Sequence, residues 1–527
     1  MASYLLTAGL AVAAAARAAV VAPRAANSTT VVAGAVNSTT CNGKQYVYEE
    51  LAGYGFVVSD AVDKFGDNLG GLGSAIHMEK KSWKKSCNGT YTGTLWSLPD
   101  RGWNTEGTLN FQPRVHKFTV TLTPAHNATV ANPSAPNLYL TYQDTIRFSG
   151  PDGTPATGLD ADVSGHLSYP GFPDLPVATY TGDGFGGDGP GGKRIPIDCE
   201  GLAVNDDGSF WVSDEYGPYV YLFDHSGKML TAIRPPDAII PFRNGTESFS
   251  AASPPHYIDN GEGPLPNPEH PDTGRDNNHG FEGLSVSEDG KTLWVLLQAA
   301  TVQEGGLEKQ TQRYTRFLKY DISTPLKPVY KAEYIVPLPA YIDPTAKASK
   351  NPKIAAQSEV HALPNGQFLV LSRDGGAGHG QENSQSQYRN IDVFDISAAT
   401  DIKAAGQGYD DEGGAVADTK GVLRQGVQAA EYCAFLDFNV NAQLGRFGLH
   451  NGGAQDAALL NEKWESIAVV PVDPRRPDGD EHFVFSLSDN DFITQNGFLN
   501  DGRFRYADST GFNLDSQALV FKVKIPK

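Results

Sequence analysis

Charged residues recur at matching places in a repeated sequence pattern. A glutamate opens a short apolar run ahead of a Gly turn in four copies: Glu200, Glu282, Glu359 and Glu465. Charged residues also end the runs that return from the turns, and a fainter first copy shares this feature: Asp100, Arg101, Asp214, Arg373, Asp374, Asp489 and Asp491. A hairpin places both sets at the end opposite its turn. If the copies surround one axis, these side chains converge on one face of the molecule.

A ring of carboxylates needs a compensating charge, because confined carboxylates repel one another and retain protons or bind cations. Calcium is the ion that we expect, since it is a hard cation that takes oxygen ligands from irregular loops rich in Asp, Asn and Gly. The predicted ligands are Glu200, Asp214, Glu282, Glu359, Asp374, Glu465 and Asp489. The alternative for any one of the glutamates is that it accepts backbone N–H groups of a neighbouring blade and only locks the fold.

The predicted catalytic residues are His279, Glu282, Arg101 and Arg373. The two arginines could fork onto a phosphate or carboxylate group, and a metal ion would help them to stabilise charge that develops during hydrolysis. His279 precedes the run that Glu282 opens, and an imidazole titrates near neutrality, so His279 is the candidate for proton transfer. Salt bridges to the acids are the alternative role for the arginines, and a loop histidine without a catalytic role is the alternative for His279.

Short strands must position these residues. Each copy has two strands around a Gly turn, as in residues 199–215 and 281–298, and Asp-Gly and Asn-Gly turns between apolar runs are strong hairpin signals. A third strand follows in each copy and a fourth is often visible, which is the composition of a β-propeller blade. We therefore predict an all-β fold, a single β-propeller of five to six, or at most seven, four-stranded blades with long inserted loops. A β-sandwich, the competing architecture, would not reuse one signature in every copy.

Two further segments bear on this architecture. The last copy shows no fourth strand after residues 521–524, and we expect a strand near residues 45–49 to supply it and close the ring. The Gly-rich stretch of residues 182–192 lacks the Gly-Lys-Ser/Thr ending of a phosphate-binding P-loop. We interpret it as a surface loop, with a flexible lid or a calcium-binding loop over the mouth of the propeller as the alternatives.

The repeated motifs carry a resemblance to a known family. The strongest copy reads Glu200-Gly-Leu-Ala-Val204 and continues as Trp211-Val-Ser-Asp-Glu-Tyr-Gly-Pro218. It returns as Phe281-Glu-Gly-Leu-Ser-Val286, Ser372-Arg-Asp374 and Trp464-Glu-Ser-Ile-Ala-Val469. In combination these motifs resemble the phytase-like family, also described by the esterase-like activity of phytase, over roughly residues 55–525. The resemblance implies a secreted propeller with phosphoesterase or esterase activity.

Composition and charge restrict the partners of the chain. The formal net charge of −19 argues against nucleic acid and anionic membranes, because both repel an acidic protein. Beyond the N-terminal apolar run, the sequence offers no segment that could span a bilayer. We expect a monomer whose partner is a small-molecule ester or phosphoester substrate.

The N-terminus and the cysteines indicate export. Residues 1–22 are predicted to be a signal peptide, 23–44 a flexible leader, and 45–527 the propeller domain. Asn-x-Ser/Thr triplets predict glycosylation at Asn27, Asn37, Asn88, Asn127 and Asn244. The even set of cysteines predicts two disulfides, Cys41–Cys87 and Cys199–Cys433, although the sequence leaves the other two pairings open. The protein is expected to be secreted.

Three functions are consistent with these residues. The leading hypothesis is a secreted, calcium-dependent hydrolase of phosphate or carboxylic esters with its site at the mouth of the propeller channel. The second is a propeller that binds a glycan or protein without catalysis. The third is a lactonase-like propeller enzyme that uses one metal ion near the axis.

Overall fold

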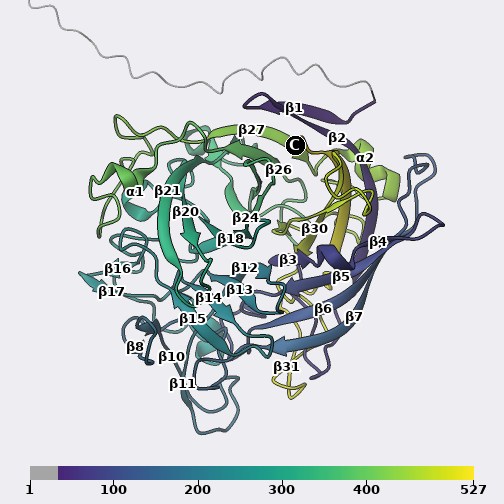
Figure 1. Ribbon diagram of the computed structural model, residues 1–527. Helices are drawn as coiled ribbons and strands as arrows, with labels where there is room; N and C mark the ends of the chain where they lie inside the picture. Colours follow the sequence, from purple (N-terminus) through teal and green to yellow (C-terminus); the bar gives the residue numbers. More distant parts are fainter. Residues whose placement is uncertain (1–33) are drawn as a thin grey trace, which may run out of the picture.

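Five antiparallel sheets surround a common axis in the computed structural model, which describes residues 34–527 (Figure 1). Each sheet is one blade of a β-propeller, and the predicted all-β fold is confirmed with the lowest of the expected blade numbers. The predicted signal peptide and the sequon at Asn27 lie outside the described residues. The strands of the five blades are β3 (Ala75–Met78), β4 (Lys84–Lys85), β5 (Tyr91–Leu98), β6 (Arg114–Leu122) and β7 (Leu138–Arg147) in blade 1; β12 (Cys199–Val204), β13 (Phe210–Asp214), β14 (Val220–Phe223) and β15 (Met229–Ile233) in blade 2; β18 (Phe281–Val286), β19 (Thr292–Leu297), β20 (Tyr314–Asp321) and β21 (Val329–Pro337) in blade 3; β24 (Ala356–Ala362), β25 (Phe368–Arg373), β26 (Arg389–Asp395) and β27 (Glu431–Asp437) in blade 4; and β28 (Lys463–Trp464), β29 (Ala468–Pro471), β30 (Glu481–Asp489), β33 (Ser516–Lys524), β2 (Lys44–Val57) and β1 (Asn37–Cys41) in blade 5.

The innermost strands position the candidate site. These strands are β3, β12, β18, β24 and the β28–β29 pair. Contacts join β3 to β12, β12 to β18, β18 to β24 and β29 to β3, while β28 contacts the second strand of blade 4, β25. The hairpins form as the turn residues predict: Gly208 has a φ of +83° in the turn between β12 and β13, a conformation that costs glycine least. Because all inner strands run in the same direction along the axis, their first residues share one end of the ring.

Apolar side chains fill the space between adjacent blades. Five hydrophobic clusters each combine residues of two neighbouring blades, for example Trp211 of blade 2 with Leu284 of blade 3 and Trp294 of blade 3 with Phe368 of blade 4. Alternating apolar positions on both faces of each sheet supply these clusters. The core is therefore a set of interfaces between blades, and the axis is left to polar side chains.

The two ends of the described chain share one blade. Strand β2 pairs antiparallel with β33, from Val47 opposite Lys524 to Val57 opposite Ser516. This confirms that an N-terminal strand completes the last blade. The predicted boundary of the flexible leader at residue 44 is wrong, because residues 37–41 already form β1 and pair with β2. The sheet extends further because the outer edge of β2 offers unpaired backbone groups.

The disulfide differs from the predicted pairing. Cys41 in β1 is bonded to Cys433 in β27, with Cα atoms 5.8 Å apart. Both strands are at the outside of the ring, where the Asn37 side chain also donates to the Phe435 carbonyl at 2.5 Å. Cys199 is a buried free thiol in the innermost strand of blade 2, and Cys87 is an exposed free thiol. The predicted Cys41–Cys87 and Cys199–Cys433 bonds are therefore wrong, because these pairs lie in different layers of the ring.

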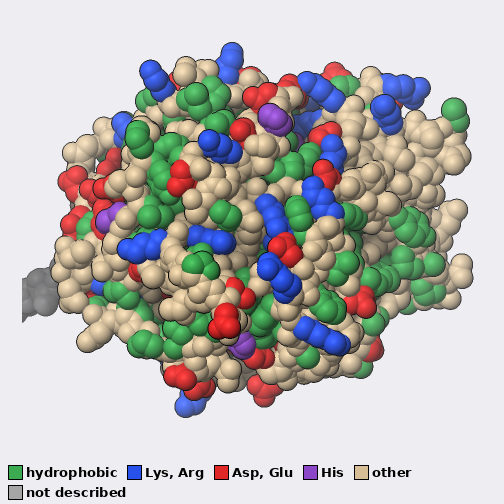
Figure 2. Space-filling view, turned by 90° about the horizontal axis from the view of Figure 1, so that it is seen from below, with side chains coloured by type: hydrophobic (Ala, Val, Ile, Leu, Met, Phe, Trp, Pro, Cys, Tyr) green, Lys and Arg blue, Asp and Glu red, His purple; other side chains and the backbone are tan. Residues whose placement is uncertain are grey.

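Long connections join the blades at the end that carries the acidic residues. They contain the short strands β8 (His166–Leu167), β9 (Leu175–Pro176), β10 (Ala178–Tyr180), β11 (Gly192–Arg194), β16 (Phe242–Arg243), β17 (Thr246–Glu247), β22 (Ala340–Tyr341) and β23 (Lys353–Ile354). A long loop within blade 5, between β30 and β33, contains β31 (Gly497–Leu499) and β32 (Phe504–Tyr506). The α-helices are α1 (Ile402–Ala405) and α2 (Asn441–Leu444). Figure 2 views the molecule from the side on which β10, β11 and β31 lie in Figure 1.

The surface features are consistent with export. Asn88, Asn127 and Asn244 are exposed, as glycosylation requires, whereas Asn37 is partly buried in β1. Glycosylation at these positions stays a prediction. Among residues 34–527, no helix has the length and apolar character needed to cross a membrane.

Candidate active site

Two β-bulges turn glutamates away from the regular strand pattern at the axis. The register of β12 shifts between Cys199 and Gly201, and that of β18 shifts between Phe281 and Gly283. The extra residues at these shifts are Glu200 and Glu282, and their side chains are 5% and 2% exposed. A bulge commonly re-aims a side chain beside a functional site. Both predicted ligands therefore lie where the sequence pattern places them.

Glu359 has a different role, because blade 4 is shifted by one residue relative to the sequence pattern. The bulge of β24 lies between Gln357 and Glu359, so Ser358 occupies the place of Glu200 and Glu282. The Glu359 carboxylate accepts the N–H groups of Leu284 at 3.0 Å and Val360 at 2.7 Å. The first of these bonds ties blade 4 to blade 3. For Glu359 the structure thus shows the locking role rather than a place among the converging carboxylates.

In the second strand of each hairpin, the strand pairing decides which residue lies at the axis. In blades 2, 3 and 4 the residue just before the bulge pairs with Asp214, Leu297 and Ser372. The next residue of the second strand reaches the axis, and these residues are Glu215, Gln298 and Arg373. Asp214 precedes this position. Its carboxylate accepts the N–H groups of Asp198, Tyr216 and Gly217 at 2.9, 2.9 and 3.0 Å, and the Tyr221 hydroxyl at 3.1 Å. Asp214 therefore holds the loop after β13, and its oxygens are fully engaged.

Asp374, like Asp214, does not lie among the carboxylates at the axis. Its carboxylate accepts the Ser386 hydroxyl at 2.7 Å and the Gln387 N–H at 2.6 Å. These bonds fix the connection between β25 and β26. Of the seven predicted ligands, the structure brings together Glu200, Glu282, Glu465 and Asp489.

A compact group of three carboxylates lies beside these residues. One oxygen each of Asp100, Asp198 and Glu200 can be chosen so that all three lie within 4.8 Å of one another, and all three side chains are buried. Asp100 follows β5, and Asp198 stands two residues before Glu200. Within residues 34–527, no hydrogen bond reaches the Glu200 carboxylate. We call these three residues the acidic triad.

A lysine neutralises a second carboxylate group next to the triad. Nζ of Lys463 lies 2.6 Å from Oδ2 of Asp489 and 2.9 Å from Oδ1 of Asp491. It also lies 3.8 Å from Oε2 of Glu465 and 3.9 Å from Oδ2 of Asp100. Asp100, Asp489 and Asp491 would otherwise be close enough to hold a cation. Lys463 thus occupies this second position, and Asp100 belongs to both groups.

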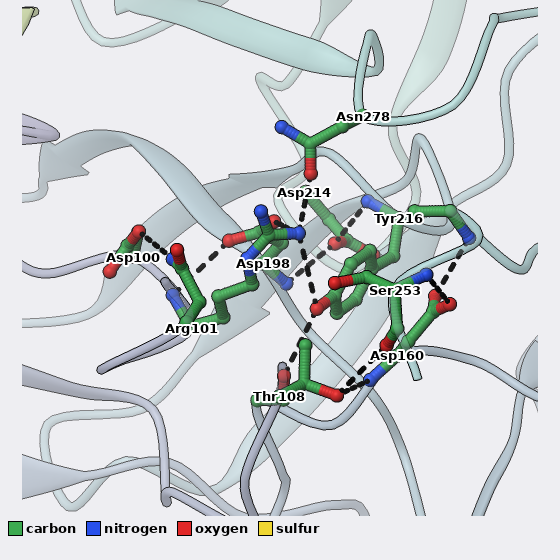
Figure 3. A network of polar contacts seen from close by, with 12 residues as sticks. Asp100, Arg101, Thr108, Asp160, Asp198, Asp214, Tyr216, Ser253 and Asn278 are labelled. Atoms are coloured by element: carbon green, nitrogen blue, oxygen red, sulfur yellow. Dashed lines mark hydrogen bonds and ion pairs between the residues drawn. The ribbon is translucent and has the colours of Figure 1, made fainter. Parts of the chain in front are cut away.

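Two arginines border the acidic residues. Arg373 donates to Glu465, and its Nη1 lies 3.8 Å from Glu462. Arg101 forms an ion pair with Asp198 at 3.0 Å and donates to the side-chain oxygen of Asn278 (Figure 3). The Nε atoms of both arginines are buried without a hydrogen-bond partner in the described chain. Each guanidinium therefore keeps a donor for a further group.

The central glutamates also retain unused acceptors. Glu282 accepts the Gln298 side-chain amide through Oε1, while its Oε2 is buried without a hydrogen-bond partner among the described residues. Oε1 of Glu215 is also buried without a hydrogen-bond partner among the described residues. An unpaired buried carboxylate is costly unless it binds a proton or a cation. We call the acidic triad together with Glu215, Glu282 and Glu465 the acidic cage.

Electrostatics explain how the cage is tolerated. Burial raises the pKa of Glu200 well above its ordinary value, and the neighbouring Glu282 carboxylate adds to the effect. Burial together with the Asp198 charge raises the pKa of Glu215 to about 8. Burial also raises the pKa of Asp489 to about 6, although Lys463 opposes this effect. Without a cation, part of the cage is protonated at neutral pH.

His279 lies at the rim. Its Nδ1 is 3.9 Å from Oδ2 of Asp276, and burial lowers its pKa. In the described structure no hydrogen bond or ion pair joins the His279 side chain to the acidic cage. The neighbouring Asn278 contacts Arg101, so the His279 loop borders the site without supplying its imidazole to the carboxylates.

Three residues of the site were not singled out in the sequence: Asp198, Glu215 and Lys463. Asp198 and Lys463 each stand two residues before a repeated glutamate, Glu200 and Glu465. This shared spacing from a repeated glutamate was a usable signal in the sequence. Glu215 stands next to the predicted Asp214, and only the bulge decides which of the two reaches the axis.

Comparisons with known proteins agree with the fold and the repeated motifs. The family model described as "Phytase-like: Esterase-like activity of phytase" matches residues 69–492. An uncharacterized secreted protein of Arthroderma benhamiae is 54% identical over 468 residues, which cover 88% of this chain and 90% of that protein. This relative and the disulfide confirm the predicted secreted location.

Solved structures add little to this assignment. A putative 6-phosphogluconolactonase of Bacteroides fragilis is 8% identical with a TM-score of 0.24, and the match covers 92% of this chain and 98% of that chain. The Nup170 N-terminal domain–Nup53 complex of Chaetomium thermophilum is 11% identical with a TM-score of 0.28, over 86% of this chain and 52% of that chain. Neither similarity is close enough to carry a functional argument.

Proposed function

The chain belongs to the phytase-like family, and from this premise we propose that it is a calcium-dependent hydrolase of small phosphate or carboxylic esters. The acidic cage is the proposed active site. The observation that carries the proposal is the convergence of Asp100, Asp198 and Glu200 within 4.8 Å, with Arg101 paired to Asp198, Arg373 paired to Glu465, and the Nε of each arginine unpaired in the described chain. Such a site combines a place for a cation with donors for an anionic substrate.

The residues of the triad fit a hard divalent cation. All three offer carboxylate oxygens, which calcium prefers, and the Glu200 carboxylate receives no hydrogen bond from residues 34–527. Of the nearby cations, Arg101 pairs with Asp198 of the triad, and Lys463 pairs with Asp489 and Asp491 outside it. A bound calcium ion would supply Lewis-acid polarisation of the ester or phosphoryl oxygen. Asp100, Asp198 and Glu200 would hold it.

The arginines suit the binding and orientation of the substrate. A guanidinium presents donors in a planar fork that matches phosphate and carboxylate groups. Arg101 is held by Asp198 and Asn278, and Arg373 by Glu465, so both groups are fixed in place before a substrate binds. Fixed donors stabilise charge that develops in the transition state without a reorganisation cost.

We assign proton transfer to Glu282 rather than to His279. Oε2 of Glu282 is buried and unpaired, and burial with the neighbouring Glu215 charge raises the pKa of this carboxyl well above its ordinary value. A carboxyl that keeps its proton near neutral pH can donate it to a leaving group. His279, by contrast, faces Asp276 at the rim.

The test is hydrolysis by the full chain with 4-nitrophenyl phosphate and 4-nitrophenyl butyrate as substrates. EDTA should abolish activity, and calcium should restore it. The Glu200→Gln variant should lose at least about tenfold in rate at a calcium concentration that saturates the native protein, because one charged ligand contributes on the order of 1.4 kcal/mol or more. Asp206→Asn, which changes an exposed carboxylate paired with Lys81, is the matched control.

The two substrates separate phosphate esters from carboxylic esters. Full activity in EDTA, or native activity of Glu200→Gln, would contradict the proposed metal site. Calcium binding without turnover of either substrate class would favour the non-catalytic binding module.

A further inference from the structure

A second hollow lies outward from the axis, between the end of blade 1 and the Gly-rich loop of residues 182–192. Its volume is about 370 Å³, within the range of small-molecule sites. The charged residues of the lining are four arginines and three aspartates: Arg114, Arg147, Arg194, Arg503, Asp67, Asp183 and Asp501. Asn110, Tyr180 and Phe185 also line it. It shares no lining residue with the acidic cage. We call it the arginine pocket.

The Gly-rich loop is a fixed wall of this pocket rather than a flexible lid. The Asp183 carboxylate accepts the N–H groups of Phe185 at 2.8 Å and Gly187 at 2.9 Å. Asn500 donates to the same carboxylate at 3.1 Å. The loop is thus held by hydrogen bonds within itself and by one from Asn500, in the connection that follows β30. Its shape is set before any ligand binds.

Arg194 supplies an uncompensated positive charge. Its guanidinium stacks over the Tyr180 ring at 5.1 Å, and no carboxylate lies within 4.0 Å of it in the described chain. Arg147 and Arg503 share Asp501, at 2.6 Å and 3.1 Å, and Arg147 also pairs with Asp67 at 3.2 Å. Figure 2 shows Lys and Arg side chains gathered across the middle of this side of the molecule. On a chain of formal charge −19, such a site selects an anion.

Two buried atoms of the pocket lack partners. Asn110 is 5% exposed, and its side-chain amide donates to the Asp183 carbonyl at 2.9 Å while its Oδ1 accepts no hydrogen bond from the described residues. The Nε of Arg147 is likewise unpaired. An unpaired acceptor and an unpaired charged donor from two residues that line one pocket suit a ligand with both a hydroxyl group and a negative charge.

From these features we propose that the arginine pocket binds an anionic sugar. The negative group would lie against Arg194 and Arg147, a hydroxyl would donate to Oδ1 of Asn110, and the sugar ring would pack against Tyr180 and Phe185. Phosphorylated sugars and uronic acids share this chemistry. The inference does not depend on the proposed hydrolase function, because the pocket and the cage have separate residues.

Calorimetric titration of the full chain in EDTA tests the proposal, since EDTA removes any metal-dependent binding at the cage. The probes are glucose 6-phosphate, glucuronate, inorganic phosphate and glucose. The anionic sugars should bind more tightly than glucose and than inorganic phosphate, and the two anionic sugars together distinguish a phosphate from a carboxylate preference. Equal affinity for inorganic phosphate and glucose 6-phosphate would overturn the assignment of a sugar, and absence of binding by both anionic sugars would overturn the site.

Variants then locate the binding. Arg194→Gln and Asn110→Ala should each weaken binding of the preferred anionic sugar by about tenfold or more, as expected for the loss of a hydrogen bond to a charged or buried group. Arg505→Gln is the control, because Arg505 is an exposed arginine on β32 outside the pocket lining. Melting temperatures of the variants report whether they fold. Native affinity in a folded Arg194→Gln protein would overturn the proposal, whereas a Glu200→Gln protein should bind the sugar normally even if the hydrolase proposal fails.

Discussion

Nζ of Lys463 donates to Oδ2 of Asp489 at 2.6 Å, and this contact divides the acidic residues at the axis into two groups. One group already contains its cation, the ammonium of Lys463. In the other, the acidic triad of Asp100, Asp198 and Glu200, Arg101 pairs with Asp198 at 3.0 Å, and no ion pair within residues 34–527 reaches Glu200. The division suggests a site that needs one external ion rather than two.

The first prediction follows from this division. Lys463→Met should remove the internal cation and leave Asp489 and Asp491 unpaired, which typically costs about 3–5 kcal/mol for a buried pair. Stability in EDTA should fall accordingly, and calcium should restore more of it than in the native protein. Chemical unfolding with and without calcium measures both effects. Lys463→Arg, which keeps the charge, should lose less stability, and a Lys463→Met protein as stable as the native one in EDTA would contradict the role given to Lys463.

The second prediction concerns pH. Burial raises the pKa of Asp489 to about 6, and it raises the pKa values of Asp214 and Glu333 to about 7. A carboxyl whose pKa is higher in the folded than in the unfolded chain stabilises the fold below its unfolded pKa, and this contribution is lost as the pH rises through the folded pKa. Burial lowers the pKa of His77 to about 4 and those of His116 and His361 to about 3, and these groups favour the fold at the higher pH. The carboxyls, with Glu215 whose pKa burial raises to about 8, shift by more in sum, so in EDTA the protein should melt at a higher temperature at pH 5 than at pH 8.

Calcium should reduce this difference, because a cation bound by the triad compensates cage carboxylates such as Glu200 and Glu215, which also ionise as the pH rises. Scanning calorimetry at both pH values, with EDTA or with calcium, measures the effect. A melting temperature in EDTA that rises from pH 5 to pH 8 would show that the buried carboxyls do not govern stability in this range.

The third prediction separates locking from metal binding. Glu359→Ala should leave the N–H groups of Leu284 and Val360 without their acceptor and destabilise the protein by about 1–3 kcal/mol. Calcium affinity should be unchanged, because Glu359 does not belong to the acidic cage. Glu200→Gln should show the reverse pattern, with weakened calcium binding. Urea unfolding and calcium titration of both variants distinguish the two roles.

The fourth prediction concerns the bond between β1 and β27. Cys41→Ser should destabilise the protein by about 2–4 kcal/mol, the usual contribution of a disulfide. Cys87→Ser, which changes an exposed free thiol, is the control and should leave stability unchanged. Thiol titration of the unfolded, unreduced native chain should find two free thiols. Four free thiols, or none, would contradict the observed bonding.

The sequence predicted the architecture well because propeller blades repeat their pattern. Short apolar runs around Gly turns fixed the hairpins, and the missing last strand pointed correctly to an N-terminal partner. Glu200 and Glu282 were placed correctly because each fills the extra position of a bulge. The repeat therefore revealed both the fold and the end of the ring that carries the acidic residues.

The errors were shifts of one residue and contacts between distant segments. Glu359 follows the bulge position instead of occupying it, and a slip of one residue sends a strand side chain to the other face. A single sequence does not show where a bulge falls, so Asp214 was also preferred over Glu215. The disulfide could not be paired correctly, because Cys41 and Cys433 meet only after β1 joins the outside of the ring.

The sharing of blade 5 by β2 and β33 has a consequence for biosynthesis. Cys41 leaves the ribosome 392 residues before its partner cysteine, and β33, the strand that pairs with β2 to close the ring, is made after both cysteines. During translocation the early segment must wait with an unpaired edge and a reduced thiol. A chain that stops before residue 433 cannot form this bond, so the oxidised bond shows that synthesis has passed through the outer strand of blade 4.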